Sequence, residues 1–153
     1  RHKIDDVTEE YWNERMNVNL RHYFFTVQSV KKSMIENGGG SIINMGSTSW
    51  MIGQGGMPAY TAAKSGVVGL TRSFARDLGE FNIRVNSVVP GWVLTQRQID
   101  LWLNDESKKE LRHRQCLKEG LMPHELAQVV LFFSSEQASG CTNQSYVVDK
   151  GWL

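Results

Sequence analysis

Short apolar segments rich in β-branched residues alternate along this chain with longer segments whose apolar residues recur every three or four positions. The short segments, residues 41–45, 83–89 and 145–148, have the continuous apolar character of strands that are buried on both faces. The longer segments have the periodicity of helices. Strands that alternate with helices predict an α/β fold, in which helices cover both faces of a doubly wound parallel sheet.

Three helices are predicted, over residues 7–37, 58–79 and 123–133. Asp6 and Glu9 have the spacing of a capping box at the start of the first helix. Gly66 and Gly69 lie inside the second helix, where each costs roughly 1 kcal/mol relative to alanine, a cost that close approach of another backbone would offset. Residues 94–120 are more polar and predict a weakly helical, mobile flap. The predicted order is therefore helix, strand, helix, strand, flap, helix, strand.

The composition excludes several classes of protein. The 153 residues carry a net charge of +1, so no strong field favours nucleic acid or an acidic membrane. No apolar run reaches the ~20 residues that a membrane helix needs. Cys116 and Cys141 stand far apart without a CxxC motif, so we expect no metal site and no disulfide framework, and a reducing, cytoplasmic setting.

Aromatic side chains divide into two groups by position. Those that fall on the helical pattern are expected to lie in the core: Trp12, Phe24, Phe74, Phe132 and Phe133. Trp50, Trp92 and Trp102 follow a strand or lie in the flap. For each of them, a structural role and a place in the wall of the substrate site are equally expected.

Tyr60 and Lys64 are four residues apart on the second predicted helix and therefore share a face. The ammonium of a nearby lysine favours the phenolate form of a tyrosine, which suits the pair to general base catalysis near neutral pH. Ser47 follows the first strand, and Pro90, Gly91 and Thr95 follow the second. Ligands bind at the carboxyl ends of strands in open α/β sheets, so these segments are expected to converge on one site.

Asn19 lies in the middle of the first helix, where asparagine is unfavourable unless its side chain or backbone has another task. Together with this residue, several motifs resemble the short-chain dehydrogenase/reductase family in order and spacing along the whole chain. They are Asn17-Val18-Asn19, Ser47, Tyr60-Thr61-Ala62-Ala63-Lys64 and Arg84-Val85-Asn86-Ser87-Val88-Val89-Pro90-Gly91.

The resemblance implies a Rossmann-type fold, a nicotinamide cofactor (NAD or NADP, with NAD favoured) and a set of catalytic roles. Tyr60 would take the hydroxyl proton as the hydride leaves, and Lys64 would assist Tyr60 and bind the nicotinamide ribose. Ser47 would orient the reacting oxygen, and Asn19 would hold a water that links Lys64 to solvent. The cofactor would also meet Pro90, Gly91, Val93 and Thr95.

A narrower resemblance, to the bacterial D-xylose 1-dehydrogenases, rests on segments such as Ser49-Trp50, Thr95-Gln96-Arg97-Gln98 and Gln115-Cys116-Leu117-Lys118. It implies oxidation of an aldose to its lactone. Gln54, Trp92 and Arg97, with Ser47, are the candidates for substrate contact, although Arg97 is expected rather to pair with Asp100 or Asp105. The alternative within the family is a 3-oxoacyl thioester reductase.

The family's glycine-rich turn and the residue that discriminates NAD from NADP are not found in this sequence. We therefore expect residues 1–153 to be the C-terminal part of a single dinucleotide-binding domain that lacks its upstream half. The resemblance also implies a homo-oligomer, either a dimer or a tetramer. The alternative from a different class is a catalytically incompetent fragment that associates with itself through an open strand edge.

Overall fold

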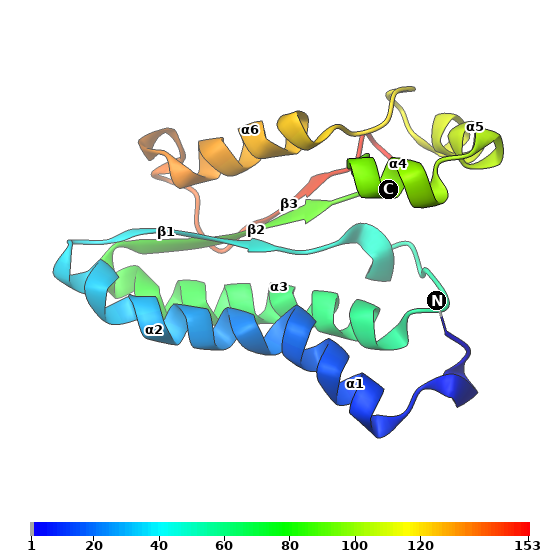
Figure 1. Ribbon diagram of the computed structural model, residues 1–153. Helices are drawn as coiled ribbons and strands as arrows, with labels where there is room; N and C mark the ends of the chain where they lie inside the picture. The colour runs from blue at the N-terminus through cyan, green and yellow to red at the C-terminus, as the bar shows by residue number, and fades with distance from the viewer. Residues whose placement is uncertain (1) are drawn as a thin grey trace.

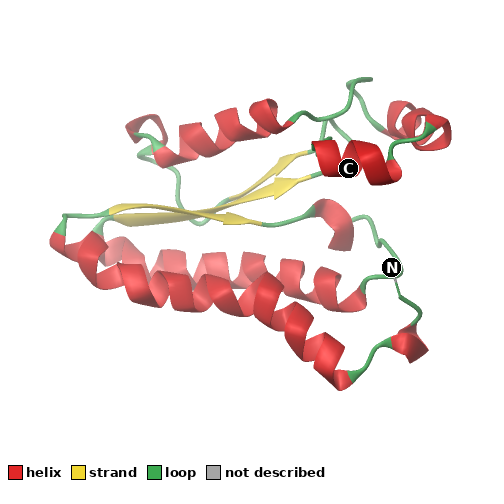
Figure 2. Ribbon diagram, viewed as in Figure 1, coloured by secondary structure: helices red, strands yellow, loops and turns green. Residues whose placement is uncertain are grey.

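A three-stranded, all-parallel sheet lies between two layers of helices in the computed structural model, which describes residues 2–153 (Figure 1). The strands β1 (Gly40–Met45), β2 (Ile83–Pro90) and β3 (Ser145–Val148) follow the order β1-β2-β3. Each predicted strand is confirmed to within one residue at either end. Asn44 pairs with Ser87 and Pro90 with Val148, so the carboxyl ends of all three strands lie at the same end of the sheet (Figure 2).

The helices confirm the predicted alternation. Their bounds are Glu9–Met16 (α1), His22–Glu36 (α2), Pro58–Leu78 (α3), Gln96–Trp102 (α4), Asp105–Arg114 (α5) and Pro123–Ser134 (α6). A π-helical segment, η2 (Asn17–Arg21), joins α1 to α2, and short turns of helix cover Ile4–Asp6 (η1), Thr48–Trp50 (η3), Gly79–Phe81 (η4) and Glu136–Ala138 (η5). The layer of α1, α2 and α3 covers one face of the sheet, and α6 covers the other (Figure 1).

The predicted N-cap of the first helix is wrong. Asp6 belongs to the separate turn η1, and the N-cap of the helix lies two residues later, where the Thr8 hydroxyl accepts a hydrogen bond from the Tyr11 N–H at 3.2 Å. Asp6 and Thr8 could each cap the start of a helix. Thr8 caps α1 because its own backbone is extended, as an N-cap requires, and its hydroxyl accepts from a backbone N–H of the first turn.

Two apolar cores lie on opposite faces of the sheet because successive strand side chains alternate. Val85 of β2 packs with Val27 and Phe74 beneath the sheet, while Val88 packs with Phe133 and the rest of α6 above it. Phe74 and Phe133 are buried as predicted. The core prediction is wrong for three other aromatic residues, whose side chains are 38–42% exposed: Trp12, Phe24 and Phe132.

The predicted flap consists of two capped helices rather than weakly helical chain. Thr95 caps α4 by accepting from the Gln98 N–H, and Asn104 caps α5 by accepting from the Ser107 N–H at 2.8 Å. A single parallel bridge between Val93 and Leu121 closes the segment at its base. The mobility of the flap stays a prediction.

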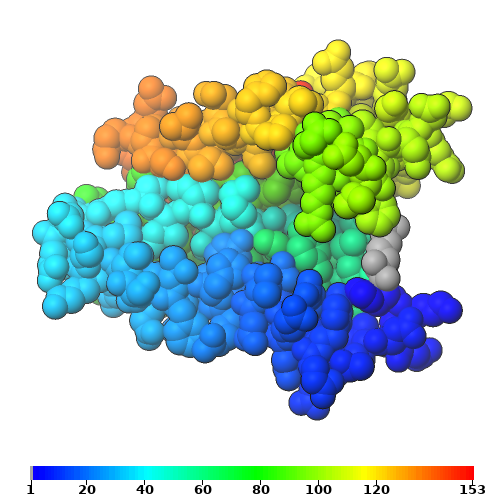
Figure 3. Space-filling view, in the orientation of Figure 1, coloured from blue at the N-terminus to red at the C-terminus, as the bar shows by residue number. Residues whose placement is uncertain are grey.

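Figure 3 shows residues of β1 at the surface between the two helical layers, which is consistent with the place of β1 at the edge of the sheet. Among residues 2–153, no helix is both long and apolar enough to cross a membrane. The same part of the chain contains no group of three His, Cys, Asp or Glu side chains placed to hold a metal ion. Cys116 is an exposed free thiol.

Candidate active site

The site forms at the end of β1, where the N-terminal turns of α3 bring Tyr60 and Lys64 against the sheet. Pro58 starts α3 at a position that lacks a hydrogen-bond partner in any helix, so its missing N–H costs nothing. Lys64 lies two turns into the helix and reaches the last residue of β1, where its ammonium donates to the Met45 carbonyl at 3.0 Å. The Lys64 Nζ also lies 5.8 Å from the centre of the Tyr60 ring.

A second tyrosine completes this cluster. Lys64 Nζ donates to the Tyr23 hydroxyl at 3.2 Å, and that hydroxyl donates in turn to the Met45 carbonyl at 2.8 Å. Burial lowers the pKa of Lys64, because the charged ammonium loses solvent. Burial also raises the pKa of Tyr23, and the nearby Tyr60 raises it further, since two phenolates would repel each other.

Ser47 stands two residues beyond β1 and is half-buried. Its hydroxyl accepts a hydrogen bond from the Ser49 N–H at 3.2 Å, so that it caps the turn η3, and it donates to the Ser49 hydroxyl at 3.0 Å. The local network therefore fixes the Ser47 oxygen at the strand end. Ser49 is itself buried and was not predicted as part of the site.

Asn19 lies in the π-helical segment, and its side chain donates to the Arg15 carbonyl at 2.9 Å. This bond gives the asparagine side chain a partner where the helical ladder changes. The role of Asn19 in holding a water that links Lys64 to solvent stays a prediction. The same segment presents Leu20 to α3, where a Cβ on Gly66 would come within 3.1 Å of the Leu20 side chain. The close approach at Gly66 thus involves a side chain rather than a backbone, while Gly69 faces open space.

The four residues predicted to border the nicotinamide follow β2 closely. Pro90 ends the strand, and Gly91 lies so near Asp149 that a Cβ there would fall 2.6 Å from the Asp149 Cβ. Val93 forms the bridge to Leu121, and Thr95 is the cap of α4. Each position therefore has a packing or capping role, and their contact with a cofactor stays a prediction.

The candidates for substrate contact are dispersed. Gln54 and Trp50 line a hollow of about 340 Å³ together with residues of η3 and of the first turns of α3. The Trp92 indole N–H donates to the Gln98 side chain at 2.8 Å, and Trp92 is not among the residues that line this hollow. Arg97 is exposed on α4, and neither Asp100 nor Asp105 forms an ion pair with it, because they contact Gln96 and Lys108 instead. The expected pairing of Arg97 is therefore wrong.

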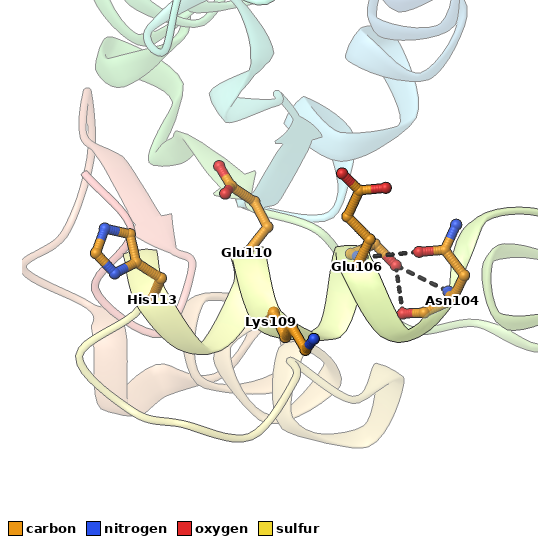
Figure 4. A pocket seen from close by; sticks show the side chains of 6 residues that line it. Asn104, Glu106, Lys109, Glu110 and His113 are labelled. Carbon is orange, nitrogen blue, oxygen red and sulfur yellow. Dashed lines mark hydrogen bonds between the residues drawn. The ribbon is translucent and has the colours of Figure 1, made fainter.

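A larger hollow, of about 490 Å³, lies on α5 and is formed by residues of that helix and its N-cap (Figure 4). Asn104, Glu106, Glu110 and His113 line it, and Asn104 is occupied in capping the helix. It contains none of the predicted site residues. The catalytic candidates Ser47, Tyr60 and Lys64 lie elsewhere, around the end of β1 and the start of α3.

Sequence reasoning missed Tyr23, which lies within the first predicted helix. A signal was present: Tyr23 lies four residues after Asn19 and so shares its helix face, and a tyrosine on an inward face needs a partner for its hydroxyl.

A family model described as enoyl-(acyl carrier protein) reductase, of the short-chain dehydrogenase type, matches residues 1–153. The chain belongs to the short-chain dehydrogenase/reductase family. It is 47% identical over 152 residues to a D-xylose 1-dehydrogenase of Caulobacter vibrioides, and 44% identical over 151 residues to a probable galactose dehydrogenase, GalD, of Rhizobium meliloti. These alignments cover 99% of the chain, but only 61% and 59% of the two relatives.

Among solved structures, a 4-hydroxyisoleucine dehydrogenase complexed with NADH superposes on this family member with a TM-score of 0.93 at 27% identity. The match covers 99% of the chain and 63% of that protein. The chain thus has the architecture of part of a Rossmann-type domain, and it spans about three fifths of the length of the relatives that it matches.

Proposed function

We propose that this chain carries the catalytic residues of a nicotinamide-dependent oxidoreductase, which transfers a hydride between the cofactor and an alcohol or carbonyl. The observation that carries the proposal is the position of the Lys64 ammonium, held on the Met45 carbonyl beside the Tyr60 ring. Ser47 lies two residues farther along the same strand end. An acid–base tyrosine, a cation and a hydroxyl donor are the groups that an alcohol or carbonyl substrate requires.

Each residue has one role in this proposal. Tyr60 removes the proton of the substrate hydroxyl during oxidation and returns it during reduction, and Lys64 favours the phenolate through its charge. Ser47 donates to the reacting oxygen by turning its hydroxyl away from Ser49. When it is bound, the nicotinamide ring supplies the chemistry of accepting or giving the hydride.

The residues present fit such a cofactor. Lys64 has three N–H donors, and its hydrogen bonds within residues 2–153 use two of them, on Met45 and Tyr23. The third donor suits a ribose hydroxyl. We assign the nicotinamide side of the site to Pro90, Gly91, Val93 and Thr95, and we favour NAD over NADP.

An aldose such as D-xylose is the substrate that we propose, with the lactone as product. The chain is similar to two sugar dehydrogenases, one named for D-xylose and the other for galactose. This similarity supports an aldose as the substrate class more than it supports either sugar. Lower similarity, at 37% identity, to 3-oxoacyl-[acyl-carrier-protein] reductases keeps a second candidate open, namely reduction of a 3-oxoacyl thioester, in which case free sugars would not be oxidised.

We further propose that the protein is a cytoplasmic homo-oligomer, a dimer or a tetramer. Phe24 and Phe25 of α2 are 42% and 44% exposed, and Gly69 leaves the outer face of α3 without a side chain. Apolar surface on adjacent helices supports association with a second copy. Sedimentation of the purified protein tests this: a monomer at micromolar concentration would contradict the proposal.

The test of the proposed reaction is formation of NADH and NADPH by the gene product that contains this chain, measured across a panel of aldoses. We expect oxidation of D-xylose or a related aldose with NAD, and a loss of at least about 10²-fold in kcat for Tyr60→Phe, the scale of general base catalysis. Tyr146→Phe, the same change at an exposed tyrosine of β3, is the matched control and should keep the wild-type rate.

Two outcomes would revise the proposal in different ways. Reduction of 3-oxoacyl thioesters without sugar oxidation would keep the residue roles and replace the substrate. A folded protein that binds neither NADH nor NADPH in a fluorescence titration would support the alternative of a non-catalytic, self-associating fragment.

A further inference from the structure

The Lys64 ammonium is held from two elements besides its own helix. The Met45 carbonyl accepts from it at the end of β1, at 3.0 Å, and the Tyr23 hydroxyl accepts from it on α2, at 3.2 Å. The Tyr23 hydroxyl closes the triangle by donating to Met45 at 2.8 Å. Because the Tyr23 proton points to the carbonyl, the hydroxyl lone pairs face the ammonium, and the arrangement has one consistent set of donors and acceptors.

We propose that Tyr23 is a positioning residue for Lys64, whose hydroxyl and the Met45 carbonyl together fix the ammonium at the end of β1 and leave one N–H donor for a bound ligand. The catalytic meaning of this inference rests on the proposed function, because Lys64 acts there through Tyr60. Tyr23 itself is not a catalytic residue in this proposal, since the contact that defines its role is with Lys64.

The geometry favours this role over simple packing. The Tyr23 ring lies 5.4 Å from Lys64 Nζ, so that the aromatic face and the hydroxyl both stabilise the cation. The π-helical segment Asn17–Arg21 ends directly before α2, and the extra residue that such a turn inserts rotates all following side chains relative to those before it. The rotation sets the direction in which Tyr23 leaves the helix.

Replacing Tyr23 with phenylalanine removes the hydroxyl and keeps the ring. The ammonium then loses an acceptor, so its charged form becomes less favoured and the neutral amine more abundant at a given pH. The titratable groups that face Lys64 are Tyr23 and Tyr60, and Tyr60 remains in the variant. A side chain that only filled space would not change the protonation of Lys64.

The experiment is competitive acylation of lysine amines with a trace of isotopically labelled reagent, read out by mass spectrometry of the Lys64 peptide between pH 7 and pH 11. Lys32, whose side chain is 87% exposed, is the internal reference. We expect labelling of Lys64 relative to Lys32 at pH 8 to rise by at least about tenfold in Tyr23→Phe, which corresponds to the loss of one hydrogen bond to a charged group. Tyr146→Phe should leave the ratio unchanged.

An unchanged ratio in a folded Tyr23→Phe chain would overturn the proposal. If that variant does not fold, Tyr23→Met repeats the test, because methionine adapts to irregular gaps and also lacks the hydroxyl. The measurement needs neither cofactor nor substrate. A rise in the labelling ratio together with an absence of dehydrogenase activity would therefore uphold the positioning role and reject the proposed function. An unchanged ratio together with dehydrogenase activity would reject the positioning role and uphold the proposed function.

Discussion

Arg84 joins the sheet to the end of α6, and its replacement provides the sharpest test of how this fold is stabilised. From β2 its guanidinium donates to the carbonyls of Phe133 at 2.9 Å, Ser135 at 3.1 Å and Cys141 at 3.3 Å. Two of these carbonyls lie at the C-terminus of α6, where the helix dipole favours a positive charge.

The cost of removing this side chain follows from these three contacts. A hydrogen bond from a charged donor contributes about 1.5–3 kcal/mol. The Phe133 carbonyl keeps a second donor, the Ser41 hydroxyl at 2.9 Å, and the guanidinium is only partly buried, so both considerations reduce the sum. We expect Arg84→Met to lower the free energy of unfolding by about 3 kcal/mol, which for a chain of this size lowers Tm by about 6–12 °C.

Thermal unfolding followed by circular dichroism measures this effect. Arg84→Lys should fall between wild type and Arg84→Met, because it keeps the charge and loses the fork that reaches three carbonyls. Arg72→Met is the matched control on an exposed position of α3 and should change Tm by little. If Arg84→Met melts within about 2 °C of the wild type, the three hydrogen bonds do not hold the end of α6 and the reasoning is wrong.

Two further predictions concern the site. Gly91→Ala should destabilise the chain by about 1–3 kcal/mol, because the new Cβ would meet the Asp149 backbone. Gly140→Ala, where a new Cβ meets nothing within 4 Å, should change the stability by less than about 0.5 kcal/mol. Equal effects in urea unfolding would show that close packing is not what requires the glycine at residue 91. Burial lowers the pKa of Lys64 in the folded chain below its usual 10.5. At a pH between the folded and the unfolded pKa, the unfolded chain therefore binds more protons, and the contribution of Lys64 to stability rises with pH. Lys64→Met should remove this rise in urea midpoints measured from pH 7 to pH 10, and a slope identical to that of the wild type would contradict the assigned burial.

The family motif Arg-Val-Asn shows that a recognisable pattern can have a structural role. Asn86 is fully buried; its amide donates to the Cys141 carbonyl at 2.8 Å and its oxygen accepts from the Gln144 N–H at 3.1 Å. Together with Arg84 it fixes the loop that delivers the chain from α6 to β3. The sequence predicted the fold partly through these residues, although their task is to position a loop rather than to bind a ligand.

The sequence by itself determined the alternation of strands and helices, the bounds of the three strands and the placement of Tyr60 and Lys64 on one helix face. These properties depend on local periodicity and on residue spacing, which the chain carries whatever it packs against. The N-cap was predicted wrongly because Asp6 and Thr8 are both suitable caps, and the choice between them depends on the backbone before the helix.

Only the tertiary structure decided which side chains meet. The contact between Lys64 and Tyr23 joins α3 to α2 across 41 residues of the chain, and no local pattern contains it. The same reason explains the exposed Phe24 and Phe132, since a helical pattern identifies an apolar face without showing whether another element covers it. Local physics therefore defines the elements, and their packing decides that the lysine of the site is held by a tyrosine from another helix.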